Sequence, residues 1–574
     1  MSKQLSLHLS SSSQLRSLGS AFSFKEKFIL YTAIIILLLS LIIWGANVYL
    51  SSTHSVPTFG GEYTEGIVGE PLYINPIISQ SNEIDAALCQ LIFSSLLKYD
   101  SEGNLINDLT ENYTLSEDGL IYTFKIKPGV KWHDKENLNT NDILFTINLI
   151  KDPSYKSSLR GDWQDVQIEA PDENTIVFKL DKPYAPFPNK LTFGILPRHL
   201  FQDISADKFL LNEFIRKPIG SGPFVFSDFK KDEHDNIISY QLIANEEYHA
   251  GRPFLDKINF NFYPDEEMLI ESYNKKEING FGAASYQKIP SFTTRKDTQI
   301  IKMRTPRYFA VFFNELKSKP LANDNVRKAL SYATDKKYII NQVFNGYAEP
   351  QYSPLLNSFG QFNSSPDIEK YEYNFVKAEE VLDQEGWKKE ADGIRKKDGQ
   401  PLEFTLITTQ WPDLVKTAEI LKEQWEKLGI KVEISSLPIT DIQQNFIKPR
   451  EYSAILFGQE YFGNDPDPYY FWHSSGKKDP GRNIAVYENS TVDEQLEKAR
   501  QSGNLDERKQ FYFEFEKQVS ADAPATFLYS PDYVYLLNKK LLGIETKAVI
   551  NAPARFSDAS HWYIKTKRIK KEAQ

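Results

Sequence analysis

One stretch of this 574-residue chain limits its possible folds more than any other: the run from Phe28 to Leu50 holds no charged residue. As a helix it is long enough to cross roughly 30 Å of hydrocarbon. It is also longer than the roughly 7–15 apolar residues of a secretory signal. The sequence therefore predicts a retained transmembrane anchor at 28–50. Cleavage between Ala46 and Ser55 is the alternative.

The charges beside this run predict its orientation. Arg16, Lys25 and Lys27 precede it, and no Lys or Arg occurs from Val48 to Glu70. The positive-inside rule then places the N-terminus in the cytoplasm. We expect a single-pass protein of the inner (cytoplasmic) membrane with the bulk of the chain extracytoplasmic. Residues 1–27 are expected to form a disordered tail and residues 51–60 a linker.

Composition excludes several classes of function. The net charge of −10 is spread along the chain with no basic domain, so no nucleic-acid partner is expected. The single cysteine, Cys89, cannot form an intramolecular disulfide. The eight histidines form no His-x-x-x-His pair and there is no Gly-x-Ser-x-Gly motif, so we expect no metal site, no cofactor and no catalytic residue.

The segment from Phe312 to Gly346 predicts a strand followed by two capped helices. Its apolar residues recur at the spacing of one helix face: Val326, Ala329, Leu330 and Ala333. Asn323 or Asp324 is the expected N-cap of the first helix, and Asp335 that of the second. A second region, 404–434, alternates strand, helix and strand. This pattern indicates a parallel α/β lobe with ligand loops at the ends of its strands. Trp411, at the end of a strand, is placed either to contact a ligand or to pack in the core or at its rim.

The 312–346 segment closely resembles the central motif of the family 5 extracellular solute-binding proteins, the peptide- and nickel-type receptors of ABC importers. That motif has Asn, then Pro-(Leu/Phe), then Asp-x-x-Val-Arg-x-Ala-Leu-x-Tyr-Ala-x-Asp. Further motifs of the family follow the same order along residues 60–562. They include Ile74-Asn75-Pro76, Tyr122 to Asp134, Gly220-Ser221-Gly222-Pro223 and Asn245 to Asp256.

The resemblance implies a fold: an α/β, periplasmic-binding-protein-like receptor with two lobes, of the large three-domain type II variety, behind the transmembrane helix. The implied segments are a discontinuous main lobe (61–99, 196–305 and 525–562), an inserted domain (100–195), a C-terminal α/β lobe (306–524) and a basic tail (563–574).

The resemblance also implies a function: capture of a solute between the lobes and delivery to ABC transporter permease and ATPase subunits by a monomeric ectodomain. An oligopeptide is the first expectation for the solute, with nickel chelates, sugars and opine-like compounds as alternatives. A sensor or chaperone of the same fold, and an exported hydrolase, remain as rival functions.

The strand ending near Leu456 leads into the most site-like cluster, 457–468, in which two acids near Pro also allow tight turns as the alternative to a binding site. Peptide-binding members of the family carry Asp-Tyr-x-(Asp/Glu)-Pro here, and their first Asp pairs with the ammonium group of the peptide. Counting back from Pro468 places Asn464 at that position, so the alternative carboxylates are Asp465 and Glu460. The expected ligand-binding residues are Ser79, Asn82, Asn314, Trp411, Gln459, Glu460, Tyr461, Asn464 and Asp465.

Overall fold

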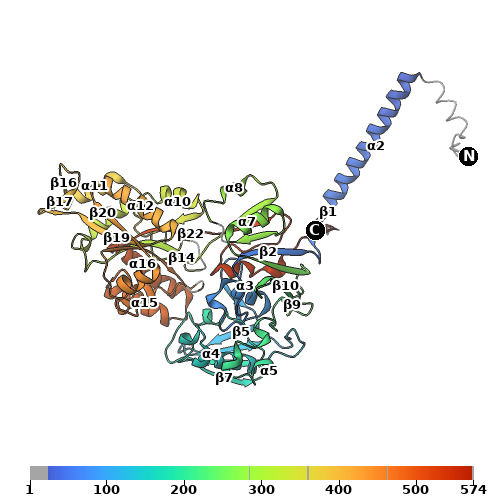
Figure 1. Ribbon diagram of the computed structural model, residues 1–574, viewed down its shortest axis with the longest axis horizontal. Coiled ribbons are helices and arrows are strands. Elements are labelled where there is room, and N and C mark those ends of the chain that lie inside the picture. Colours follow the sequence, from blue (N-terminus) through green and yellow to red (C-terminus); the bar gives the residue numbers. More distant parts are fainter. Residues whose placement is uncertain (1–22, 283–284, 358–360, 462, 464, 572–574) are drawn as a thin grey trace, which may run out of the picture. The chain divides into compact units, whose positions relative to one another are not determined.

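The structure is a computed structural model that describes residues 23–282, 285–357, 361–461, 463 and 465–571 (Figure 1). The chain divides into two compact units, 1–58 with 565–574 and 59–564. Most of the predicted disordered tail, and the predicted site residue Asn464, lie outside the described residues.

The first unit contains the apolar helix α2 (Phe24–Ser52), which is longer than the predicted 28–50. A capping box starts it: the Ser23 hydroxyl accepts from the amide of Glu26, and the Glu26 carboxylate accepts from the amide of Ser23. By length and composition α2 can cross a membrane, a test that a signal sequence also passes.

Two strands follow where a linker and a basic tail were expected. β1 (Thr53–Pro57) pairs antiparallel with β24 (Thr566–Lys570), so that Thr53 faces Lys570 and Pro57 faces Thr566. The pairing joins the two ends of the chain. No local pattern predicts it, because the partner of each strand is supplied by the opposite terminus.

In the second unit, the main lobe is built on a mixed seven-stranded sheet. Its strands, in spatial order, are β13 (Thr298–Met303), β23 (Tyr533–Asn538), β12 (Gly280–Gly282), β2 (Glu62–Val68), β11 (Lys257–Tyr263), β10 (Ile237–Ala244) and β9 (Phe224–Lys231). β2 runs parallel to β11 and β12, and the other neighbours are antiparallel. The helix α7 (Glu266–Lys275) contacts β2 and β11.

Helix α3 (Glu83–Ile92) belongs to this lobe. The chain turns extended at Phe93, and Leu97–Tyr99 forms strand β3, paired with β4 (Leu105–Asn107). The apolar residues Phe93, Leu96 and Leu97 after the helix are buried in the hydrophobic core.

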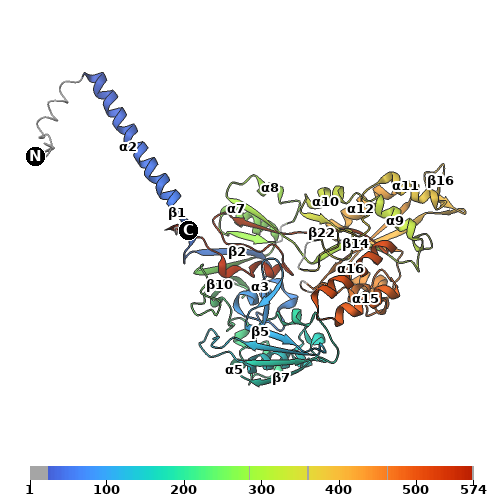
Figure 2. The same cartoon turned by 180° about the vertical axis from the view of Figure 1, so that it is seen from behind.

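A separate antiparallel sheet lies in the 100–195 region (Figure 2). Its strand order is β5 (Thr110–Leu115), β6 (Ile121–Ile126), β8 (Thr175–Lys179) and β7 (Gln167–Asp172), and helix α4 (Thr140–Lys151) contacts β7. In β6, Tyr122, Phe124 and Ile126 are buried while the residues between them are not, which is the period of a strand with one buried face.

The third part of the unit, the C-terminal lobe, is built on a six-stranded sheet. Its strands, in spatial order, are β15 (Ala348–Pro350), β22 (Ala525–Pro531), β14 (Arg307–Phe313), β21 (Ala454–Glu460), β19 (Glu403–Thr409) and β20 (Lys431–Leu437). Its longer helices are α9 (Asp324–Tyr332), α10 (Lys336–Phe344), α11 (Phe375–Gln384), α12 (Pro412–Lys427), α15 (Ser490–Gln501) and α16 (Leu505–Asp522).

Local chemistry explains the elements of this lobe. Asn323 caps α9 and Asp335 caps α10, and the side chain of each accepts a hydrogen bond from a backbone amide of its helix. Val326, Ala329 and Leu330 are fully buried on the inner face of α9. Helix α12 connects the parallel strands β19 and β20, the strand–helix–strand unit expected from the sequence.

The chain passes between the two large sheets twice within the described residues. The first crossing lies between Met303 and Arg307. The second lies at Asp532, because β22 pairs with β14 in the C-terminal lobe and β23 pairs with β13 in the main lobe. The return to the seven-stranded sheet therefore follows β22.

Candidate functional site

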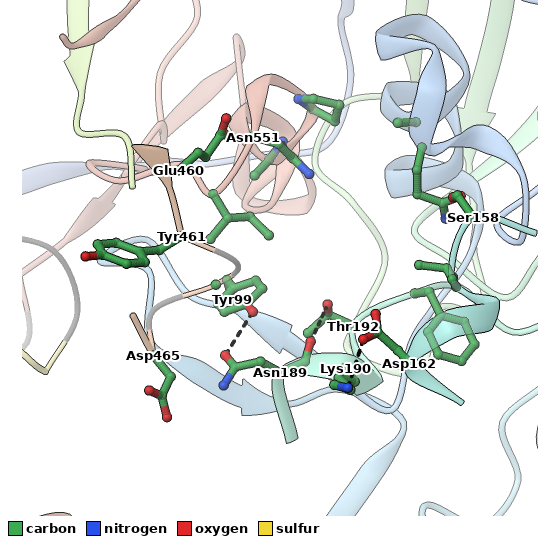
Figure 3. Close-up of a pocket in the computed structure, with 18 of the residues that line it drawn as sticks. Tyr99, Ser158, Asp162, Asn189, Lys190, Thr192, Glu460, Tyr461, Asp465 and Asn551 are labelled. Atoms are coloured by element: carbon green, nitrogen blue, oxygen red, sulfur yellow. Dashed lines mark hydrogen bonds and ion pairs between the residues drawn. The ribbon is translucent and has the colours of Figure 1, made fainter. Parts of the chain in front are cut away.

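A cavity of about 1490 Å³ lies between the main lobe, the inserted domain and the C-terminal lobe. Its walls come from residues 76–108, from 158–163 and 184–194, from Pro223 and Tyr248, from the described residues of 458–482, and from 550–560. Figure 3 shows Ser158, Asp162 and Lys190 on one side of this space, with Glu460 and Tyr461 across from them.

The end of β21 supplies three of the predicted site residues. Gln459 is buried and its amide oxygen accepts a hydrogen bond from the Tyr308 hydroxyl, while its Nε2 has no partner among the described residues. Glu460 pairs with Arg307, whose Nη2 lies 2.8 Å from Glu460 Oε2. The hydroxyl of buried Tyr461 donates to the Pro354 carbonyl at 2.7 Å. This part of the cavity wall thus contains one buried amide donor without a partner among the described residues and one ion-paired carboxylate.

Asp465 also lines the cavity segment, but its carboxylate is engaged within the C-terminal lobe. It forms a buried ion pair with the Arg508 guanidinium of α16 and accepts from the Tyr512 hydroxyl at 3.2 Å. Burial alone would lower the pKa of Arg508, and Asp465 raises it above its ordinary value. A ligand ammonium could reach Asp465 only in competition with this guanidinium.

Asp467 is paired in the same way with Arg500 of α15. Two parallel hydrogen bonds of 2.8 Å join Arg500 Nε and Nη2 to the two carboxylate oxygens, the bidentate geometry of strong guanidinium–carboxylate pairs. The Tyr184 hydroxyl of the inserted domain donates to the same carboxylate at 3.1 Å. The amide of Ala185 donates to the Arg500 carbonyl at 2.8 Å. These bonds join the inserted domain to the C-terminal lobe at one edge of the cavity.

Charged side chains of the wall from the main lobe and from the start of the 100–195 region are paired as well. Asp108 lies 3.2 Å from Lys98 Nζ and accepts a hydrogen bond from His249 at 3.2 Å. Burial alone would raise the pKa of Asp108, but His249 and Lys98 lower it to about 2. Glu83 pairs with the buried Arg555 at 3.1 Å.

The inserted domain adds the pair Lys190–Asp162, at 2.9 Å. Six carboxylates of the wall are therefore already neutralised by a basic side chain of the protein. Among the described residues, no group of three or more His, Cys, Asp or Glu side chains is placed to hold a metal ion.

The structure brings only part of the predicted set to the cavity. Ser79, Gln459, Glu460, Tyr461 and Asp465 line it, and their binding of a ligand stays a prediction.

Three other predicted residues are not among the lining residues. Asn82 caps α3, accepting from the amides of Ile84 and Asp85. The buried Asn314 side chain donates to the Arg450 carbonyl at 2.9 Å. Trp411 is 53% exposed as the N-cap residue of α12.

Sequence reasoning missed the contribution of the inserted domain and of the chain near its end. Ser158, Asp162, Lys190 and Asn551 line the cavity but lie in segments with no motif. Asn551 also caps a short helix by accepting from the amide of Ala554 at 3.0 Å, which is the ordinary role of Asn at a turn. Only the packing of the domains around one space distinguishes these residues from other polar surface residues.

The cavity lies between lobes, and the chain passes from one lobe to the other twice. This is the architecture of a periplasmic-binding-protein-like solute receptor. A family model described as "Bacterial extracellular solute-binding proteins, family 5 Middle" matches residues 104–481. The chain belongs to the bacterial extracellular solute-binding proteins, family 5, as its motifs indicated.

Individual relatives agree with this assignment. The oligopeptide-binding protein AppA of Bacillus subtilis is 30% identical over 499 residues, covering 85% of this chain and 89% of AppA. Its structure in complex with a nonapeptide matches with a TM-score of 0.64 and 29% identity, over 88% of this chain and 99% of that one. NikZ from Campylobacter jejuni, in complex with Ni(L-His), matches with a TM-score of 0.67 and 28% identity over the same shares.

Proposed function

We propose that this chain captures a small solute, most readily an oligopeptide, in the cavity between its lobes and delivers it to an ABC transporter permease. The observation that supports this proposal most directly is the size of the cavity. Its volume of about 1490 Å³ exceeds the roughly 300–1,000 Å³ of sites for drug-sized ligands. The nonapeptide bound by AppA supports a peptide, and the nickel–histidine complex bound by NikZ is the alternative class.

The proposed mechanism is binding by closure, with no chemical step. A ligand that touches walls from both lobes stabilises the closed state by its higher affinity for that state. The two crossings, 304–306 and Asp532, are where backbone rotation would move one lobe against the other. The permease and its ATPase subunits would then receive the ligand from the closed receptor.

The proposal includes retention of α2 as a single-pass anchor, with the N-terminus in the cytoplasm and the rest of the chain extracytoplasmic. Lys25 and Lys27 at the start of the helix, with no acidic or basic residue from Phe28 to Ser52, support this orientation. Intact mass of the protein extracted from the membrane fraction tests it. A mature chain that lacks the first 50 or so residues contradicts the anchor.

Calorimetric titration of the full chain with defined peptides and with Ni(L-His) tests solute binding. Ser158 is exposed and lines the cavity, so Ser158→Trp should fill part of it and lower affinity at least tenfold. Ser154 lies one turn earlier in the same segment, is exposed and does not line the cavity. Ser154→Trp is therefore the matched control and should bind as the parent does. Equal affinity of both variants would contradict a ligand in this cavity, and turnover of the peptide would contradict a binding-only role.

A further inference from the structure

The paired strands β1 and β24 form a basic ribbon at the C-terminal end of helix α2. The ribbon and its flanks, residues 53–58 and 565–571, carry five basic side chains and no acidic one. The basic residues are Lys565, Lys567, Arg568, Lys570 and Lys571. All five residues of β24 are exposed. The end of the chain thus returns as a second strand directly beside the residues that follow the apolar helix.

Arg568 fixes the ribbon to the helix end. Its Nε donates to the Thr53 hydroxyl at 2.8 Å, and its Nη2 donates to the carbonyls of Leu50 and Thr53, each at 3.0 Å. The last carbonyls of a helix have no partner within it and carry the negative end of the helix dipole. A guanidinium at this place satisfies these acceptors, and it holds the C-terminal end of β24 beside the end of the helix.

The lysines, in contrast, are left without an opposite charge. Lys565, Lys567, Lys570 and Lys571 have no ion pair among the described residues. Their only acidic neighbour in the sequence, Glu572, lies outside the described residues. Because successive side chains of a strand point to opposite faces, Lys567 and Lys570 lie on opposite faces of the ribbon. Together the four ammonium groups give the end of the apolar helix a local positive charge, which attracts phosphate groups.

We propose that this basic ribbon binds the phosphate groups of anionic phospholipids at the membrane surface where α2 emerges. The inference rests on α2 being retained in the membrane, as proposed above. Thr53 follows the last residue of α2 directly, so the ribbon lies at the height of the head groups. Arg568 also stacks over the ring of Tyr49, 5.8 Å from its centroid, and tyrosine is typical of the membrane interface.

The position of these charges in the sequence agrees with their location outside the cytoplasm. Orientation is read from Lys and Arg within roughly 15–20 residues of a span. The basic residues of β24 lie more than 500 residues beyond α2 and reach its end only through folding. They can therefore bind lipid on the extracytoplasmic side without opposing the orientation set by Lys25 and Lys27.

Amine labelling of the full chain tests the proposal. The protein is placed in nanodiscs of phosphatidylcholine alone or with phosphatidylglycerol, and acetylation of each lysine is followed by mass spectrometry. We expect the four ribbon lysines to react about fivefold more slowly in the anionic discs and to recover at high salt. Lys276, 72% exposed in the second unit, is the internal reference. Equal rates in the two lipids would overturn the proposal.

A matched pair of variants separates lipid binding from general charge. Native mass spectrometry of protein released from mixed discs should show phosphatidylglycerol enriched over phosphatidylcholine. Lys→Gln changes at 565, 567, 570 and 571 should abolish that enrichment. The same changes at four exposed lysines of the second unit, Lys208, Lys448, Lys539 and Lys540, should leave it intact.

Two other results would also reject the proposal. Labelling that slows only when a permease is added would assign the ribbon to a protein partner. Enrichment that survives the ribbon changes would assign lipid selectivity elsewhere. Loss of α2 by cleavage appears separately in the intact mass, so failure of the anchor is distinguishable from failure of the ribbon.

Discussion

Replacing Asp465 by Asn should damage the fold of the C-terminal lobe before it affects any ligand. The Asp465 carboxylate and the Arg508 guanidinium are both buried and face each other, with Tyr512 completing the site. The amide of Asn has nearly the same shape but no charge, so Asp465→Asn leaves a buried guanidinium without its counter-ion. Breaking one partner of a buried pair typically costs about 3–5 kcal/mol.

Glu460 provides the comparison within the same segment. Its ion pair with Arg307 is open to solvent, with the two side chains 40% and 44% exposed. A pair of this kind contributes at most about 1 kcal/mol. We therefore expect Glu460→Gln to change the free energy of unfolding by less than 1 kcal/mol, several times less than Asp465→Asn.

Equilibrium urea unfolding, followed by the fluorescence of buried Trp425 and Trp472 in this lobe, measures both effects. The double variant Asp465→Asn with Arg508→Met should recover most of the loss, because the unpaired charge is gone. The reasoning is refuted if Asp465→Asn unfolds like the parent while its affinity for a cationic peptide falls tenfold or more. That outcome would mean that Asp465 serves the ligand rather than Arg508.

Two further predictions concern the same lobe. Burial raises the pKa of Glu516 to about 6, although Ser353 and Ser364 donate hydrogen bonds to it. A folded pKa above the ordinary 4.5 means that stability rises as pH falls from 7 towards 4.5, by up to about 2 kcal/mol. Glu516→Gln should remove that share of the pH dependence in urea unfolding at pH 5 and 7, and an unchanged slope would contradict it. Gly463 has φ of +81°, and a Cβ there would overlap the Tyr99 hydroxyl. Gly463→Ala should therefore lower the free energy of unfolding by about 1–3 kcal/mol. A neutral effect would show that this segment moves freely.

Local patterns predicted the parts of the fold that local chemistry determines. The apolar face of Val326, Ala329 and Leu330 predicted a buried helix. The strand–helix–strand order at 404–434 predicted a parallel pair, because a crossover helix returns the chain in the same direction. In both cases the elements that pack together are neighbours in the sequence, so the pattern of one or two elements is enough to predict them.

The features that decide the site did not follow from local patterns. Arg508 and Asp465 are 43 residues apart, and Tyr184 and Asp467 are 283 apart. The residues near Asp465 in the sequence do not show whether its carboxylate pairs with an arginine of a helix or is free to bind a ligand. The strand β24 was expected as a tail for the same reason, since its partner β1 lies at the other end of the chain.

The pairing of charges around the cavity bears on what the receptor recognises. A carboxylate that already holds a guanidinium at hydrogen-bond distance contributes little attraction to a second cation, because the ligand must replace that guanidinium and leave it buried. Beside the exposed Lys478 and Asp479, which form no ion pair among the described residues, the side chains of the wall that remain for a ligand are neutral ones, such as the hydroxyl of Ser158. Groups of this kind bind peptide bonds, which every oligopeptide carries, rather than one particular charge. A receptor with such a wall is expected to bind the peptide backbone through neutral groups, and to recognise a terminal charge through Lys478 or Asp479 rather than through the six paired carboxylates.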